Sequence, residues 1–149
     1  MKIQIDQSGK IEYTSVPTVV ADSKGNYLFI KSNDKKYLQQ IFRKAGKPQM
    51  FVIETFSLLV LLVIQKTFSR SADYVIDVEY PGKNEIIKSY IIRFSRKLKI
   101  AILPEQINFS LIGKKSKSHW FAIKRFRNEL KGEIVELKSL LKILLDFFE

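Results

Sequence analysis

The chain has no cysteine and a single histidine among its 149 residues. Without cysteine, it can form no disulfide, thiolate zinc site or iron–sulfur cluster, and it has no cysteine nucleophile. One histidine excludes every metal site that needs two or more imidazoles. Any metal site must therefore consist mainly of carboxylates, which favour hard ions such as Mg²⁺ and Mn²⁺.

Acidic residues are scarce relative to basic ones, since 15 Asp and Glu stand against 26 Lys and Arg, a net charge of +11. Such a surface attracts polyanions, with nucleic acid the first candidate and an anionic membrane surface a distant one. The N-terminus lacks the apolar core of a signal peptide. The most apolar stretch, 51–64, contains Glu54 and is shorter than the roughly 20 residues that span a bilayer. We therefore expect a buried helix there, a cytoplasmic protein and no membrane partner.

Hydrophobic periodicity predicts one α/β domain over residues 1–149. Short β-rich segments between turn signals predict three antiparallel strands in the first third of the chain: 2–6, 18–21 and 27–30. Farther along, helix and strand periods alternate, with helices at 35–44, 48–68 and 84–98 and strands at 74–79 and 107–112. The crossover helices make the later strands parallel. The expected fold is a mixed five-stranded sheet, three antiparallel strands and then parallel ones, flanked by helices.

Two further helices are expected in the last third of the chain, at about 119–130 and 133–148. The second has a wide apolar stripe, which includes Ile134, Leu137, Leu141, Leu144 and Phe148. The ordinary interpretation of this stripe is packing onto the sheet of the domain, and a homodimer interface is the alternative because the stripe is wide for one terminal helix.

Three carboxylates lie near the ends of predicted strands or near the start of a predicted helix. Asp6 ends the first strand, Asp77 lies near the end of the fourth, and Glu54 lies in the first turns of the helix between them. If the two strands are neighbours, these groups meet at one edge of the sheet. Carboxylates brought together repel one another, and a divalent cation neutralises them. Glu79 shares a face with Asp77 by alternation and is the alternative to it as a ligand.

The order of these residues resembles the ribonuclease H-like superfamily of nucleases, resolvases and transposases, over about residues 1–130. The resemblance rests on four short motifs: Asp6 in Ile-Asp-Gln-Ser-Gly, Glu54 in Phe-Val-Ile-Glu-Thr-Phe, Asp77 in Val-Ile-Asp-Val-Glu and His119 in Ser-Lys-Ser-His-Trp. In that superfamily, acids on the first strand, the first long helix and the fourth strand bind two metal ions. A last ligand lies near the start of a late helix. The resemblance implies that all four residues are catalytic and hold two Mg²⁺ or Mn²⁺ ions.

The implied function is a divalent-metal-dependent nuclease that hydrolyses phosphodiester bonds. The chain has Asp-Gln-Ser-Gly where true ribonucleases H commonly have Asp-Gly-Ser, and it has no second histidine. We therefore expect single-stranded or branched DNA and an exonuclease-like mode, in preference to RNA–DNA hybrids. A basic set around His119 is expected to contact phosphates: Lys114, Lys115, Lys117, Lys124, Arg125 and Arg127. The alternative is a non-catalytic nucleic-acid-binding module with a degenerate site.

Overall fold

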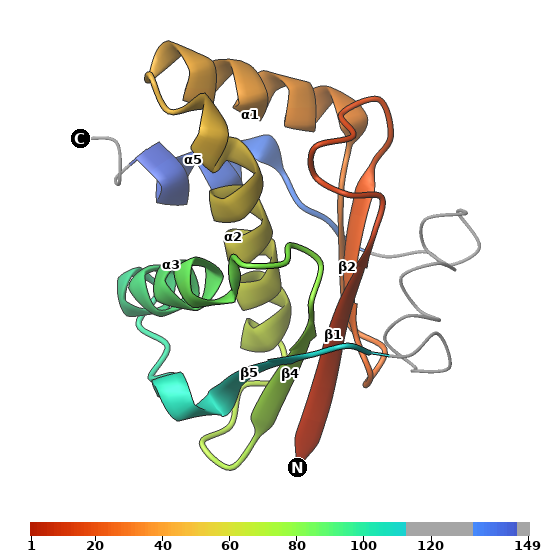
Figure 1. The fold of residues 1–149 in the computed structure, drawn as a ribbon, viewed down its shortest axis with the longest axis vertical. Helices are drawn as coiled ribbons and strands as arrows, with labels where there is room; N and C mark the ends of the chain where they lie inside the picture. The colour runs from red at the N-terminus through yellow and green to blue at the C-terminus, as the bar shows by residue number, and fades with distance from the viewer. Residues whose placement is uncertain (113–132, 146–149) are drawn as a thin grey trace.

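A six-stranded mixed sheet organises the part of the chain that the computed structural model describes, residues 1–112 and 133–145 (Figure 1). Its strand order is β5-β4-β1-β2-β3-β6. The strands are β1 (Lys2–Ser8), β2 (Thr18–Asp22), β3 (Tyr27–Ile30), β4 (Asp73–Asp77), β5 (Ile107–Ser110) and β6 (Glu133–Ile134). The first three are antiparallel, while β4 runs parallel to β1, β5 to β4 and β6 to β3. The predicted α/β layout of antiparallel and then parallel strands is confirmed, and the structure adds a sixth strand.

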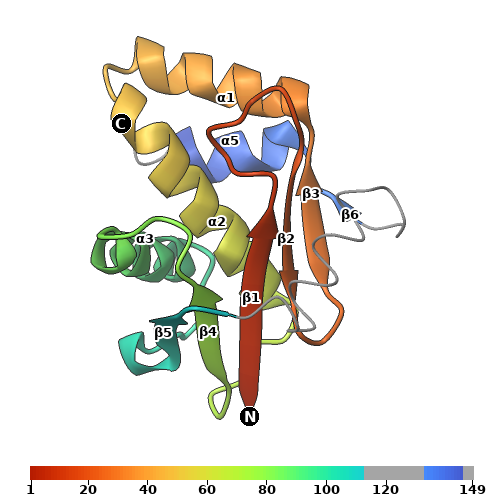
Figure 2. The same cartoon turned by 45° about the vertical axis from the view of Figure 1, so that its right-hand side comes forward.

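The helices of the described residues lie on one face of this sheet (Figures 1 and 2). They are α1 (Ser32–Lys44), α2 (Phe51–Gln65), α3 (Asn84–Lys97) and α5 (Leu137–Leu145). The helix predicted from Pro48 onward begins as one 3₁₀ turn, Pro48–Met50, before α2 starts at Phe51. A proline suits the first turn of a helix because it has no N–H to donate there.

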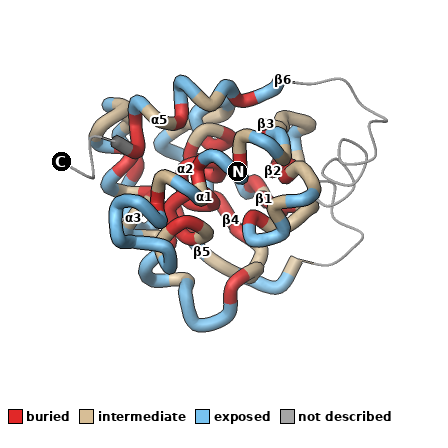
Figure 3. The backbone as a smooth tube through the Cα atoms, turned by 90° about the horizontal axis from the view of Figure 1, so that it is seen from above, coloured by how far each residue is buried: buried red, intermediate tan, exposed pale blue. Residues whose placement is uncertain are grey.

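The core lies between the sheet and α2, where buried residues concentrate (Figure 3). Ile3 and Ile5 of β1 and Ile76 of β4 are at most 1% exposed and belong to this core. Alternation along a strand sends these side chains toward the helices and their neighbours to the other face. The segment Pro48–Gln65 has the length and apolar composition of a membrane span, yet 67% of it is buried inside the protein. It is the core helix that the sequence predicted.

The segment that begins at Glu133 differs from the prediction of a continuous helix at about 133–148. Residues Glu133–Ile134 form β6, and the backbone N–H of Val135 donates to the carbonyl of Phe29 at 2.8 Å. β-Branched Ile134 and Val135 favour extended backbone, and the edge strand β3 offers unpaired backbone groups to it. The helix α5 starts only at Leu137, and its Leu140 and Leu144 are fully buried in the core. It therefore packs on the domain.

The loop between β1 and β2, residues 9–17, is fastened to α1 by a buried lysine. Lys35 is 0% exposed, and its Nζ donates to the carbonyls of Lys10 at 3.1 Å and Tyr13 at 2.8 Å and to Thr18 Oγ1 at 3.0 Å. Burial lowers the pKa of Lys35 to about 8, against the opposing charge of Glu12. Three acceptors match the three N–H groups of an ammonium, so the loop has a fixed position above the end of β1.

Candidate metal site

Asp6 and Asp77 lie side by side at the carboxyl ends of two neighbouring parallel strands. The register of β1 and β4 pairs Ile5 with Ile76, so the next residue on each strand is one of these aspartates. Asp6 also pairs with Ala21 of β2, which belongs to a small apolar cluster apart from the main core. Because Ile5 and Ile76 face the helices, alternation directs both aspartates to the opposite face of the sheet.

Glu79, two residues beyond Asp77, joins the two aspartates. Ligand oxygens of all three carboxylates lie within 4.8 Å of one another, and among the described residues these three form the group that could hold a metal ion. Burial, together with hydrogen bonds to Asp6 and Asp77 and the charges of both, raises the pKa of Glu79 to about 9. Without a cation, one proton is therefore shared within the group at neutral pH.

Backbone N–H groups orient the two aspartates. The N–H of Gln7 donates to Asp6 Oδ1 at 2.8 Å, and the N–H of Ile112 donates to Asp77 Oδ1 at 2.7 Å. Asp6 is 3% exposed, so its carboxylate is held in a largely desolvated place. The donor set consists only of carboxylate oxygens, which suits a hard divalent cation and no soft one.

Glu54 lies elsewhere, although it was predicted to be a ligand. It is buried on α2, on the helix-covered side of the sheet, at 3% exposure. Burial raises the pKa of Glu54, and the positive charges of Lys47 and Arg93 oppose this shift. Its charge acts in turn on Tyr90 of α3. Its charged partners thus lie just before α2 and on α3, and the structure does not bring it to Asp6 and Asp77.

The remaining predicted site residues lie outside the described residues. They are His119, Lys114, Lys115, Lys117, Lys124, Arg125 and Arg127. Their roles as ligand and phosphate contacts remain predictions.

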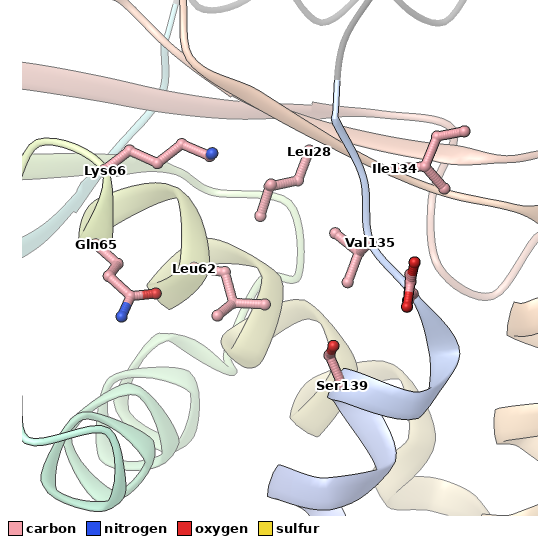
Figure 4. A pocket seen from close by; sticks show the side chains of 8 residues that line it. Leu28, Leu62, Gln65, Lys66, Ile134, Val135 and Ser139 are labelled. Carbon is pink, nitrogen blue, oxygen red and sulfur yellow. The ribbon is translucent and has the colours of Figure 1, made fainter.

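Two hollows lie at different ends of the sheet. One, of about 440 Å³, runs over β1, β4 and β5 and includes Gln4, Val75 and Asn108 in its lining, but none of the three carboxylates of the acidic group. The other, of about 330 Å³, lies between Leu28 of β3, Leu62 of α2 and Val135 before α5 (Figure 4). This second hollow has one carboxylate in its lining, Glu136, and so has no group of acids for a cation.

Comparisons of the chain with protein-family models, with curated proteins and with solved structures find no match. Function therefore has to be inferred from the chain's own geometry and charge.

Sequence reasoning treated Glu79 only as a substitute for Asp77, whereas the structure has both in one group. The signal was present in the alternation Asp77-Val78-Glu79, which puts the two acids on one face. The strand predicted at 74–79 ends at Asp77 in the structure, and the sequence pattern did not indicate which contacts keep Glu79 near Asp6 beyond that end.

Proposed function

We propose that this chain is a divalent-metal-dependent nuclease built on a ribonuclease H-like sheet. The observation that carries the proposal is the group formed by Asp6, Asp77 and Glu79 at the carboxyl ends of β1 and β4. From β1 the chain continues to β2 on one side, and from β4 it continues to β5 on the other. Such a reversal of strand order is where open α/β sheets bind their ligands.

The strand order β5-β4-β1-β2-β3 also supports a ribonuclease H-like site. The resemblance in the sequence implies one acid on the first strand and one on the fourth, at a common metal site. Asp6 and Asp77 occupy these two places. Glu79 takes the part of third carboxylate that the resemblance gave to Glu54.

The group fits Mg²⁺ or Mn²⁺, because both prefer carboxylate oxygens and keep open positions for phosphate oxygens and water. We propose a site for two ions. Bound there, they would supply electrostatic stabilisation for the charge that develops when a phosphodiester is hydrolysed. The chain's own contribution is orientation, because the N–H groups of Gln7 and Ile112 fix the two aspartates before an ion arrives.

The substrate class follows from charge. A net charge of +11 favours a polyanion, and the acidic group would lie within a surface that attracts phosphates. We propose DNA, with single-stranded or branched forms preferred to RNA–DNA hybrids, an exonuclease-like mode and a cytoplasmic place of action. The basic residues from Lys114 to Arg127 would contact the phosphates, and a homodimer remains compatible with the proposal.

The test compares two aspartates of one strand. Asp77→Asn removes a proposed ligand, whereas Asp73→Asn changes an exposed aspartate at the opposite end of β4. Both variants are assayed on labelled single-stranded, branched and duplex DNA with Mn²⁺, Mg²⁺ or EDTA. We expect metal-dependent cleavage by the wild type and by Asp73→Asn and none by Asp77→Asn. Cleavage that survives EDTA, or that Asp77→Asn retains, would contradict the proposal.

The same variants distinguish the alternative, a nucleic-acid-binding module without catalysis. Most of the affinity for nucleic acid comes from lysine and arginine contacts to phosphates, so Asp77→Asn should still bind DNA. DNA binding by every variant with cleavage by none, whatever the metal, would favour the binding module.

A further inference from the structure

Glu79 needs a support that the sheet does not provide. The strand β4 ends at Asp77, and the next contact with β5 is the N–H of Val78, which donates to the carbonyl of Ser110 at 3.1 Å. One residue farther on, the carboxyl of Glu79 lies beside those of Asp6 and Asp77, and in the fully charged state that a metal site needs these three groups repel one another. A contact from outside the sheet must therefore hold this part of the chain.

Tyr80 provides such a contact. It is 9% exposed, and its ring packs edge-on against Phe56 of α2, with centroids 5.2 Å apart and an interplanar angle of 73°. Its hydroxyl accepts a hydrogen bond from Gln7 Nε2 at 3.0 Å and donates one to Glu12 Oε1 at 3.1 Å. The hydroxyl is thus fixed both as acceptor and as donor, by the end of β1 and by the loop that follows.

The loop between β1 and β2 makes a second set of contacts with Glu79 and Tyr80, through Lys10. Lys10 Nζ donates to the backbone carbonyl of Glu79 at 3.4 Å and lies 5.6 Å from the centroid of the Tyr80 ring. The loop is itself fixed to α1, since Lys35 binds the carbonyls of Lys10 and Tyr13 and Ser32 Oγ donates to the carbonyl of Thr14 at 2.5 Å. A continuous series of contacts thus leads from α1 through the loop to Tyr80 and Glu79.

We propose that Tyr80, held by Gln7 and Glu12, is the positioning residue that keeps Glu79 beside Asp6 and Asp77 as the third carboxylate of the metal site. This inference rests on the proposed function, because it takes the acidic group to be a metal site. Tyr80 is a positioning residue and no ligand, since its hydroxyl bonds to Gln7 and Glu12 and it reaches the site as the chain neighbour of Glu79.

The first experiment measures Mn²⁺ affinity by titration calorimetry in the full-length protein and in Tyr80→Phe. This substitution keeps the ring against Phe56 and removes both hydrogen bonds of the hydroxyl. Residues that orient metal ligands typically affect affinity by 10- to 100-fold, and we expect a loss of about tenfold. The control is Tyr90→Phe, which removes a hydroxyl from a tyrosine that stacks on Phe94 within α3 and should leave affinity unchanged.

Glu12 supplies a conservative variant. Glu12→Gln keeps an oxygen that can accept from Tyr80, so it should lose less Mn²⁺ affinity than Glu12→Ala. Unchanged affinity in Tyr80→Phe, or equal losses in the two Glu12 variants, would overturn the positioning role.

A double-mutant comparison tests whether Tyr80 acts through Glu79. In a Glu79→Gln background, measured at high Mn²⁺ where Asp6 and Asp77 still bind, Tyr80→Phe should cause no further loss. A further tenfold loss would overturn the inference and leave the nuclease proposal intact. Mn²⁺ binding without any DNA cleavage would overturn the nuclease proposal and leave the inference intact. A wild type that binds no Mn²⁺ would overturn both.

Discussion

Two acidic regions lie on opposite faces of the sheet, and they have opposite electrostatic surroundings. Around Glu54 on α2, a single carboxylate is opposed by the positive charges of Lys47 and Arg93. At the ends of β1 and β4, Asp6, Asp77 and Glu79 are opposed mainly by one another. The first arrangement sets positive charges against a carboxylate, whereas the second places three carboxylates together, as the proposed metal site requires.

This difference teaches how to separate a structural acid from a functional one. Burial alone does not do so, because Glu54 and Asp6 are each 3% exposed and burial raises the pKa of both Glu54 and Glu79. The sign of the neighbouring charges does so. Crowded carboxylates are what a bound cation would compensate, so our proposal places the metal at the cluster and not at Glu54.

The largest expected effect comes from removing one carboxylate from each region. Glu79→Gln should lower Mn²⁺ affinity and DNA cleavage by about 100-fold or more, since even residues that only orient ligands are worth 10- to 100-fold. Glu54→Gln should leave both within about twofold, because its charged partners are Lys47 and Arg93 and not the carboxylates of the proposed site. Calorimetry with Mn²⁺ and a cleavage time course on labelled DNA measure the two effects. A large loss of metal binding in Glu54→Gln would mean that the two regions act as one site.

The next largest effect concerns Lys35, a buried charged group whose three hydrogen-bond acceptors are all supplied by the protein. Lys35→Met removes three hydrogen bonds from a fully buried ammonium and should lower the free energy of unfolding by about 2 kcal/mol. The adjacent Lys36 is exposed, so Lys36→Met should change it by no more than about 0.5 kcal/mol. Urea unfolding of the two variants measures the difference. Equal stabilities of the two variants would show that the hydrogen bonds of Lys35 to the loop between β1 and β2 do not stabilise the fold.

Without metal, the acidic group and Glu54 should differ in how strongly they make the free energy of unfolding depend on pH. The pKa of Glu79 is about 9 in the folded protein against an ordinary value of 4.5, so between these values the folded state keeps a proton that the unfolded chain has lost. Stability is therefore greatest at the acid end of this window and falls as pH rises through it, by at most about 1.4 kcal/mol per pH unit. Unfolding in EDTA should show this slope in the wild type and a flatter one in Glu79→Gln. Glu54→Gln should keep most of it, because Lys47 and Arg93 oppose the shift of Glu54.

The sequence could predict that Asp6 and Asp77 lie together, because the alternation of side chains along a strand shows which face each residue occupies. In Lys2–Ser8 the buried positions Ile3 and Ile5 identify the core face, and Asp6 follows on the other face, two residues before the strand ends. The helix α2 gave no such information, since 12 of its 15 residues are buried and its apolar side chains lie nearly all round. The face on which Glu54 lies could not be read from that pattern.

The sixth strand could not be predicted for a related reason. Residues Glu133–Ile134 pair with only Leu28 and Phe29, and two residues are too few to show a period of two. Their extended backbone is decided by the open edge of β3, which is a tertiary contact. Local sequence instead favoured a longer helix, because the apolar stripe of α5 extends back to Ile134.

The smallest effect concerns the charges that balance Glu54. Arg93 is exposed and also lies over the ring of Tyr90, 5.3 Å from its centroid, so solvent screens its attraction for Glu54. A double-mutant cycle with Glu54→Gln and Arg93→Gln should give a coupling of about 0.5 kcal/mol in the free energy of unfolding, and this should shrink at high salt. Because that balance needs no metal, the coupling should be the same with and without Mn²⁺. A coupling that Mn²⁺ changes would mean that the ion senses Glu54, and the distinction between the two acidic regions would then fail.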